Sequence, residues 1–131
     1  MTKILIIDDD EQVRFTLSGI LKGDGYTVIE AEDGVVGGKL FTSEQPDLVI
    51  TDIFMPEREG LEVIKEAKRA RPGCRIIAIS GGSRAVNVDF LPMAKMLGAD
   101  CVLDKPITRE ELLAAVHDTL ALESPATGMD E

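Results

Sequence analysis

The stretch KILIIDDD, residues 3–10, decides the fold of this chain. After Lys3 it is an unbroken, largely β-branched apolar run, which is typical of a strand buried on both faces of a parallel sheet. Three aspartates end the run. From residue 11 to residue 22 the apolar spacing is helical, with Val13, Leu17, Ile20 and Leu21 on one face. The stretch and the residues after it therefore predict a strand, an acidic loop and a helix.

The same change from a strand pattern to a helical pattern recurs along the whole chain. We expect strands at residues 3–7, 26–31, 48–51, 75–80 and 101–103, and helices at residues 11–22, 33–41, 60–71, 89–97 and 108–120. Thr108 and Glu111 form a capping box at the start of the last helix. This alternation predicts an α/β fold, a flavodoxin-like doubly wound five-stranded parallel sheet in the order 2-1-3-4-5, with five helices.

The length and composition of the chain limit which class of protein it can belong to and which partners it can bind. With 131 residues the chain is long enough for one domain, which we place at residues 1–122, with a flexible polar tail at residues 123–131. The 14 basic residues are outnumbered by 24 acidic ones, so direct binding to the phosphates of nucleic acid is not expected. No apolar run is long enough to span a membrane, and the N-terminus lacks the layout of a signal peptide. We therefore expect a cytoplasmic protein that binds neither nucleic acid nor membrane.

Four of the five expected strands carry a polar or charged group at the carboxyl end. Asp8 and Asp9 follow the first strand, Asp52 follows the third, Ser80 ends the fourth, and Lys105 follows the fifth. In an open α/β sheet, ligands bind outside the carboxyl ends of the strands. Each of these residues alone has an ordinary explanation, such as a helix cap or a loop. Their joint placement on one edge predicts a site.

The acidic members of this edge predict a magnesium site if the first and third strands are neighbours. Two carboxylates about 4 Å apart repel by roughly 4 kcal/mol at an effective dielectric constant of about 20. Mg²⁺ prefers carboxylate oxygens, and its binding to Asp8, Asp9 and Asp52 would remove this repulsion. With the cation bound, one of these carboxylates can accept a phosphoryl group, and the metal and Lys105 would stabilise charge on the phosphoryl oxygens.

The chain resembles the receiver domain of two-component response regulators from Ile4 to about Leu122. The resemblance rests on five stretches in the order and spacing of the family: ILIIDDDEQVR at 4–14, EAEDG at 30–34, PDLVITDIFMPEREG at 46–60, IIAISG at 76–81 and GADCVLDKP at 98–106. It implies a stand-alone, single-domain response regulator in phosphorelay signal transduction. Such a protein is no enzyme, beyond assisting its own phosphorylation and dephosphorylation.

The resemblance also assigns roles to the residues of the edge. Asp52 would be phosphorylated by a sensor histidine kinase or a histidine phosphotransfer protein. Asp9 and Asp52 would bind Mg²⁺ directly and Asp8 through water. The backbone carbonyl of Phe54 would complete the protein's share of ligands, and Lys105 would contact the phosphoryl oxygens.

The output of the signal is implied to run through Ser80, the switch hydroxyl, which would turn toward the phosphoryl group. The surface of the fourth helix, fifth strand and fifth helix would change and bind a downstream protein.

The chain departs from the family at Val102, where an aromatic residue is usual. Phe54 is bulkier than in many receivers, and we expect it to shield the acyl phosphate from water. Phe15 lies off the core face of the first helix, where it is either incidental or a docking point for the histidine-bearing partner.

Two alternatives stay open at this point. A receiver-like module could bind its partners without phosphorylation. An aspartate-based phosphatase of the same architecture carries two aspartates separated by one residue after its first strand. Asp8 and Asp10 have that spacing, but Glu11 and Gln12 follow where a threonine or valine would be expected. Uptake of a phosphoryl group from acetyl phosphate tests the phosphorylation-independent module, and turnover of small phosphoesters tests the phosphatase.

Overall fold

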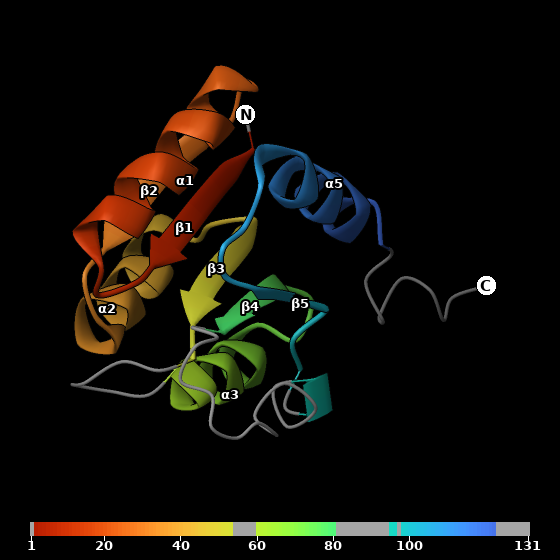
Figure 1. Ribbon diagram of the computed structural model, residues 1–131. Coiled ribbons are helices and arrows are strands. Elements are labelled where there is room, and N and C mark those ends of the chain that lie inside the picture. The colour runs from red at the N-terminus through yellow and green to blue at the C-terminus, as the bar shows by residue number, and fades with distance from the viewer. Residues whose placement is uncertain (1, 54–59, 81–94, 97, 123–131) are drawn as a thin grey trace.

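Five parallel strands form one sheet in the order β2-β1-β3-β4-β5, which confirms the expected topology (Figure 1). The computed structural model describes residues 2–53, 60–80, 95–96 and 98–122. The strands are β1 Lys3–Ile7, β2 Thr27–Ala31, β3 Leu48–Asp52, β4 Arg75–Ser80 and β5 Cys101–Asp104. Because β1 lies between β2 and β3, the residues that follow β1 and β3 meet at one edge of the sheet.

Helices cover both faces of the sheet (Figure 1). They are α1 Glu11–Gly23, α2 Gly34–Glu44, α3 Gly60–Ala70 and α5 Arg109–Leu120. The helix expected at residues 89–97 lies outside the described residues, apart from residues 95–96, which are helical. In the described part of the chain, no helix combines the length and the apolar character needed to cross a membrane.

The core consists of two layers, one on each face of the sheet. Ile4 and Ile6 of β1 face the layer that α1 and α5 complete, with Leu17 of α1 among its members. Leu5 and Ile7 face the opposite layer, completed by α2 and α3. The central strands are therefore buried on both faces, as their unbroken apolar runs predict.

Side-chain caps begin three of the helices at the residues that the sequence indicates. Oδ1 of Asp10 accepts a hydrogen bond from the N–H of Gln12 at 2.9 Å, so Asp10 is the cap of α1. Asp33 caps α2 in the same way. Both halves of the capping box between Thr108 and Glu111 are formed at the start of α5. These caps fix where each helix leaves the edge of the sheet.

Several boundaries differ from the sequence prediction by one residue, and the end of α2 differs by three. β2 begins at Thr27 rather than Tyr26, because the N–H of Tyr26 donates to a carbonyl in the last turn of α1. α2 continues past Phe41 to Glu44, since exposed polar residues extend a helix without adding to its apolar stripe. Gln45 ends α2 in a left-handed conformation, with φ at 49°.

Candidate functional site

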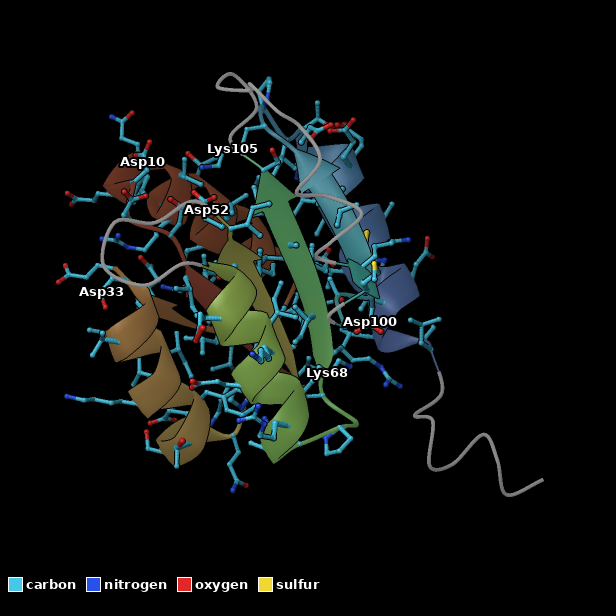
Figure 2. The ribbon with its side chains drawn as sticks, turned by 90° about the horizontal axis from the view of Figure 1, so that it is seen from below. Asp10, Asp33, Asp52, Lys68, Asp100 and Lys105 are labelled. Carbon is cyan, nitrogen blue, oxygen red and sulfur yellow. The ribbon has the colours of Figure 1, made fainter. Side chains whose placement is uncertain are left out.

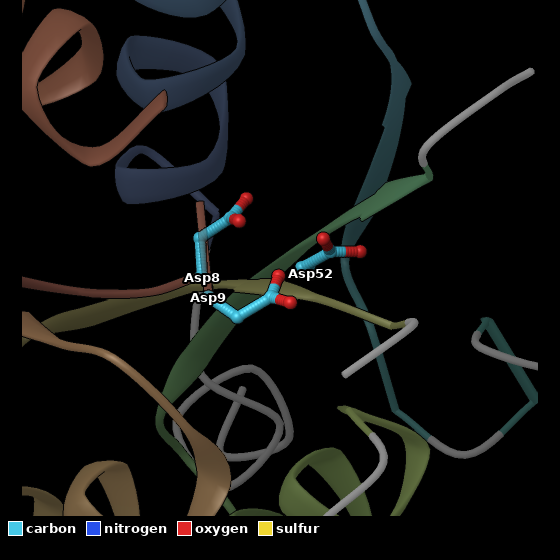
Figure 3. Close-up of side chains that lie close together, drawn as sticks. All are labelled: Asp8, Asp9 and Asp52. Carbon is cyan, nitrogen blue, oxygen red and sulfur yellow. The ribbon is translucent and has the colours of Figure 1, made fainter. Parts of the chain in front are cut away.

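The register of the sheet brings three aspartates together. Ile7 of β1 lies opposite Thr51 of β3, which places Asp8 beside Asp52 at the carboxyl edge. Asp8, Asp9 and Asp52 each offer a carboxylate oxygen, and these oxygens lie within 4.8 Å of one another (Figure 3). Asp8 and Asp52 are buried, whereas Asp9 is exposed. The acidic cluster expected at this edge is therefore present.

Lys105 adds a positive charge to the cluster. Its Nζ lies 3.1 Å from Oδ2 of Asp8 and 3.1 Å from Oδ2 of Asp52. Figure 2 shows Asp52 and Lys105 near one end of the sheet, with Lys68 and Asp100 near the other. Lys105 donates a hydrogen bond to Asp52, but its approach to Asp8 is an ion pair without hydrogen-bond geometry. Oδ2 of Asp8 is therefore a buried oxygen that accepts no hydrogen bond within the described residues.

Burial and neighbouring charges move the pKa values of this pair. Burial raises the pKa of Asp8 to about 6, and the charge of Asp52 acts in the same direction, against the N–H of Asp10 and the ammonium of Lys105. Burial alone would lower the pKa of Lys105, but the carboxylates of Asp52 and Asp8 outweigh it, so this pKa is raised. At neutral pH, Lys105 is charged and Asp8 is ionised at an energetic cost.

The groups present fit a divalent cation. Carboxylate oxygens are hard anionic ligands of the kind that Mg²⁺ prefers. One ammonium balances part of the negative charge, and no group in the described part of the chain donates a hydrogen bond to Oδ2 of Asp8. A cation bound to this cluster would reduce the repulsion among the carboxylates and give that oxygen a partner, directly or through a bound water.

The end of β4 lies next to this cluster. Ser80 pairs with Asp104 of β5, and its backbone carbonyl accepts a hydrogen bond from the N–H of Lys105 at 3.0 Å. The backbone thus places Ser80 and Lys105 side by side on the edge that carries Asp52. Phe54, expected to supply a carbonyl ligand, and the glycine-rich loop at residues 81–88 lie outside the described residues.

Comparison with protein families gives a match over most of the chain. The profile of the response regulator receiver domain covers residues 4–117. The chain belongs to this family. Receiver domains of response regulators act in two-component signalling, where they interact with histidine kinases and downstream targets. They are in general signalling domains and not enzymes.

Individual relatives agree with this assignment. The response regulator MprA of Mycobacterium sp. (strain KMS) is 35% identical over 132 residues, which are 98% of this chain and 54% of that protein. The chain thus spans about half the length of the curated relatives it matches. A receiver domain protein from Clostridium thermocellum has a TM-score of 0.84 at 30% identity, covering 92% of this chain and 94% of that one. The response regulator TrrA of Thermotoga maritima, solved in complex with Mg²⁺-BeF, has a TM-score of 0.80 at 32% identity, covering 91% and 99%.

Arg14 lies beside the acidic cluster, and the sequence analysis assigns it no role. It lies in α1, and its Nη1 donates a hydrogen bond to the backbone carbonyl of Asp8 at 2.7 Å. A signal was present in the sequence, because Arg14 lies three residues before Leu17 and seven before Leu21, on the buried stripe of the helix. A cation on an apolar stripe needs a specific partner.

Proposed function

We propose that Asp52 is the phosphoacceptor of this receiver domain and that Asp8, Asp9 and Asp52, with the backbone carbonyl of Phe54, hold the Mg²⁺ ion that supports the transfer. The observation that carries the proposal is the position of Lys105, whose Nζ lies 3.1 Å from carboxylate oxygens of both Asp8 and Asp52. A lysine in this place can neutralise a phosphoryl group on Asp52 without leaving the cluster.

The transfer is a displacement at phosphorus. A carboxylate oxygen of Asp52 attacks the phosphorus of a phosphohistidine, so that a P–O bond forms while the P–N bond breaks. The imidazole nitrogen of the partner keeps the electron pair of the broken bond. Lys105 holds Asp52 in place before the reaction and contacts the phosphoryl oxygens after it. Bound Mg²⁺ supplies stabilisation of the charge on the phosphoryl oxygens.

Incubation with acetyl phosphate and Mg²⁺, followed by mass measurement of the intact protein, tests the proposal. We expect the wild-type protein to gain the mass of one phosphoryl group and Asp52→Asn to gain none. Asp47→Asn, an exposed aspartate before β3, is the matched control and should be labelled like the wild type. No added mass in the wild-type protein would favour a module that binds partners without phosphorylation. Steady release of phosphate from small phosphoesters would favour the phosphatase.

We further propose that the histidine-bearing partner docks on the exposed face of α1. A shallow groove there lies between Val13 and Thr16 of α1 and Lys105 and Ile107 after β5, next to the acidic cluster. Phe15, on the same helix, is 79% exposed, so its ring is available to a partner.

The role of Phe15 can be tested separately from chemistry at Asp52. Phe15→Ala should slow phosphotransfer from the partner protein while leaving the unfolding midpoint and labelling by acetyl phosphate unchanged. Phosphotransfer at the wild-type rate would show that the exposed ring is incidental.

For the output we propose that Ser80 is the switch hydroxyl and that the surface of α4 (the helix expected at residues 89–97), β5 and α5 binds a downstream protein. Val102 of β5 is half-buried and packs against the core layer under α2 and α3, so methyl packing would take the place of the usual aromatic relay. We also propose that the receiver domain comprises residues 1–122 and acts in the cytoplasm; the tail expected at residues 123–131 lies outside the described residues. A pull-down that compares phosphorylated and unphosphorylated protein tests the output, and equal capture of partners would contradict it.

A further inference from the structure

Arg14 holds the loop that carries two of the three acids. Its Nη1 donates to the carbonyl of Asp8 at 2.7 Å, and its Nε lies 3.4 Å from Oε1 of Glu30 on β2. The Arg14 side chain is 15% exposed, while that of Glu30 is 37% exposed. The guanidinium therefore bridges α1, the loop after β1 and the neighbouring strand β2 from a largely buried position.

The bond to Asp8 fixes one particular peptide group. The N–H of Asp8 donates to the carbonyl of Ala31 at 3.1 Å, which continues the pairing of β1 and β2 one residue beyond the strand. The carbonyl of Asp8 belongs to the peptide that joins it to Asp9, and Arg14 holds this carbonyl. The orientation of that peptide determines where the side chain of Asp9 leaves the backbone. Asp9 is the exposed member of the cluster, so this peptide is a main restraint on its position.

We propose that Arg14 is a positioning residue for the metal site, which acts by holding the peptide between Asp8 and Asp9 so that the carboxylate of Asp9 stays within reach of Asp8 and Asp52. The inference rests on the proposed function only in taking Mg²⁺ as the bound ion. It assigns Arg14 no contact with the metal or with the phosphoryl group.

The planar guanidinium is what makes an arginine necessary at this position. Its N–H groups point in fixed, different directions, so one group can bind the carbonyl of Asp8 while another faces Glu30. A lysine has a single nitrogen on a flexible stem, so it loses the planar fork that holds both acceptors in fixed directions. Arg14→Lys therefore keeps the charge and loses the bridge.

The charge of Arg14 and its hydrogen bond have opposite effects on Mg²⁺ affinity, which makes the inference testable. A positive charge near a cation site repels the cation, so removing it should tighten Mg²⁺ binding if charge were the main effect. Loss of the hydrogen bond should weaken binding, since removal of a group that orients a metal ligand typically lowers affinity about 10- to 100-fold.

The experiment is titration of the metal-free protein with Mg²⁺ alone by calorimetry, with Arg14→Lys, Arg14→Gln and the control Arg69→Lys, an exposed arginine in the last turn of α3. We expect Arg14→Lys to raise the Kd about tenfold, Arg14→Gln to raise it by the same or a smaller factor, and Arg69→Lys to leave it within about twofold. A Kd for Arg14→Lys within twofold of wild type would overturn the inference, and so would tighter binding by Arg14→Gln.

Two further measurements separate positioning from other roles. A purely structural role would lower the thermal midpoint without changing the Kd of the folded protein. Saturating Mg²⁺ should restore labelling of Arg14→Lys by acetyl phosphate, because Asp52 and Lys105 are intact, and failure of this rescue would also count against the inference. If the wild-type protein itself bound no Mg²⁺, the metal site of the proposed function would be wrong. If the wild-type protein bound Mg²⁺ and the Arg14 variants had the same Kd, only the role of Arg14 would be rejected.

Discussion

Asp8 is fully buried, with 0% of its surface exposed, although the metal site that we propose requires its charged form. Burial raises its pKa from the ordinary 3.8 to about 6, which corresponds to roughly 3 kcal/mol against the charged form. The folded state therefore binds a proton at Asp8 more tightly than the unfolded state does. It follows that Asp8 lowers the free energy of unfolding as pH rises from about 4 to about 6, and that this loss is complete at neutral pH.

Asp8→Asn should therefore stabilise the metal-free protein. At pH 7 the free energy of unfolding should rise by about 1 to 3 kcal/mol, because an amide of the same shape carries no charge to bury. At pH 4.5 the gain should shrink to about a third, since Asp8 is then mostly protonated in the folded wild-type protein, while in the unfolded chain it is still mostly ionised. Urea unfolding in the presence of a chelator measures both values.

The matched control for Asp8→Asn is Asp118→Asn, at an exposed aspartate of α5. It should change stability by less than about 0.5 kcal/mol at either pH. A gain for Asp8→Asn that is equal at both pH values, or larger at the lower one, would contradict the conclusion that burial disfavours the charged form of Asp8.

At the scale of elements, the closeness of α2 to β1 depends on a glycine. A Cβ added at Gly37 would lie 2.5 Å from Cδ1 and 2.9 Å from Cγ1 of Ile7, a residue that is 1% exposed. Ile7 is followed directly by Asp8, so the packing of α2 supports the strand end from which the acidic cluster begins. A side chain at position 37 cannot fit unless α2 or Ile7 moves.

Gly37→Ala should destabilise the protein by about 1 to 3 kcal/mol, the usual effect of overfilling a packed interior. Gly19→Ala is the control, because Gly19 is exposed in α1 and an added Cβ would have nothing within 4 Å. This control should stabilise the protein by roughly 0.5 to 1 kcal/mol, since alanine favours the helix. Unfolding in urea distinguishes the two, and stabilisation by both substitutions would contradict the close contact of α2 with Ile7.

At the scale of the whole molecule, the strand order makes the site. β1 and β3 are separated in sequence by α1, β2 and α2, yet they are neighbours in the sheet. The resulting acidic cluster adds local repulsion to a chain whose formal net charge is −10. A ligand that binds only the folded arrangement stabilises the whole domain.

Mg²⁺ should therefore raise the thermal midpoint of the protein at neutral pH. At about ten times the Kd the gain is about 1.4 kcal/mol, or roughly 3 to 7 °C for a domain of this size. Circular dichroism with and without a chelator measures it. Asp9→Asn should lose most of the gain, and sodium chloride at the same ionic strength should not reproduce it. An equal gain in Asp9→Asn would place the bound Mg²⁺ elsewhere.

Local sequence patterns predict much of this molecule. The apolar run of residues 3–7 indicates a strand buried on both faces, and the pairing of Thr108 with Glu111 marks the start of α5, because each signal depends on neighbouring residues only. Boundaries are less predictable where the end of a helix competes with the next strand, as at Tyr26, whose N–H donates to Leu21 in the last turn of α1 instead of joining β2. Acids at the strand ends could likewise be read from the sequence as candidates for a site.

Only the tertiary structure decided how these candidates act together. Lys105 lies 3.1 Å from both Asp8 and Asp52, and Arg14 donates a hydrogen bond to the carbonyl of Asp8, which is completely buried. These contacts join residues from four different elements or the loops after them. Such contacts depend on strand order, register and the angle at which α1 leaves the sheet, which no local pattern encodes. The sequence alone therefore determined the fold class and the set of acids, while burial and the long-range partners set their charges and positions.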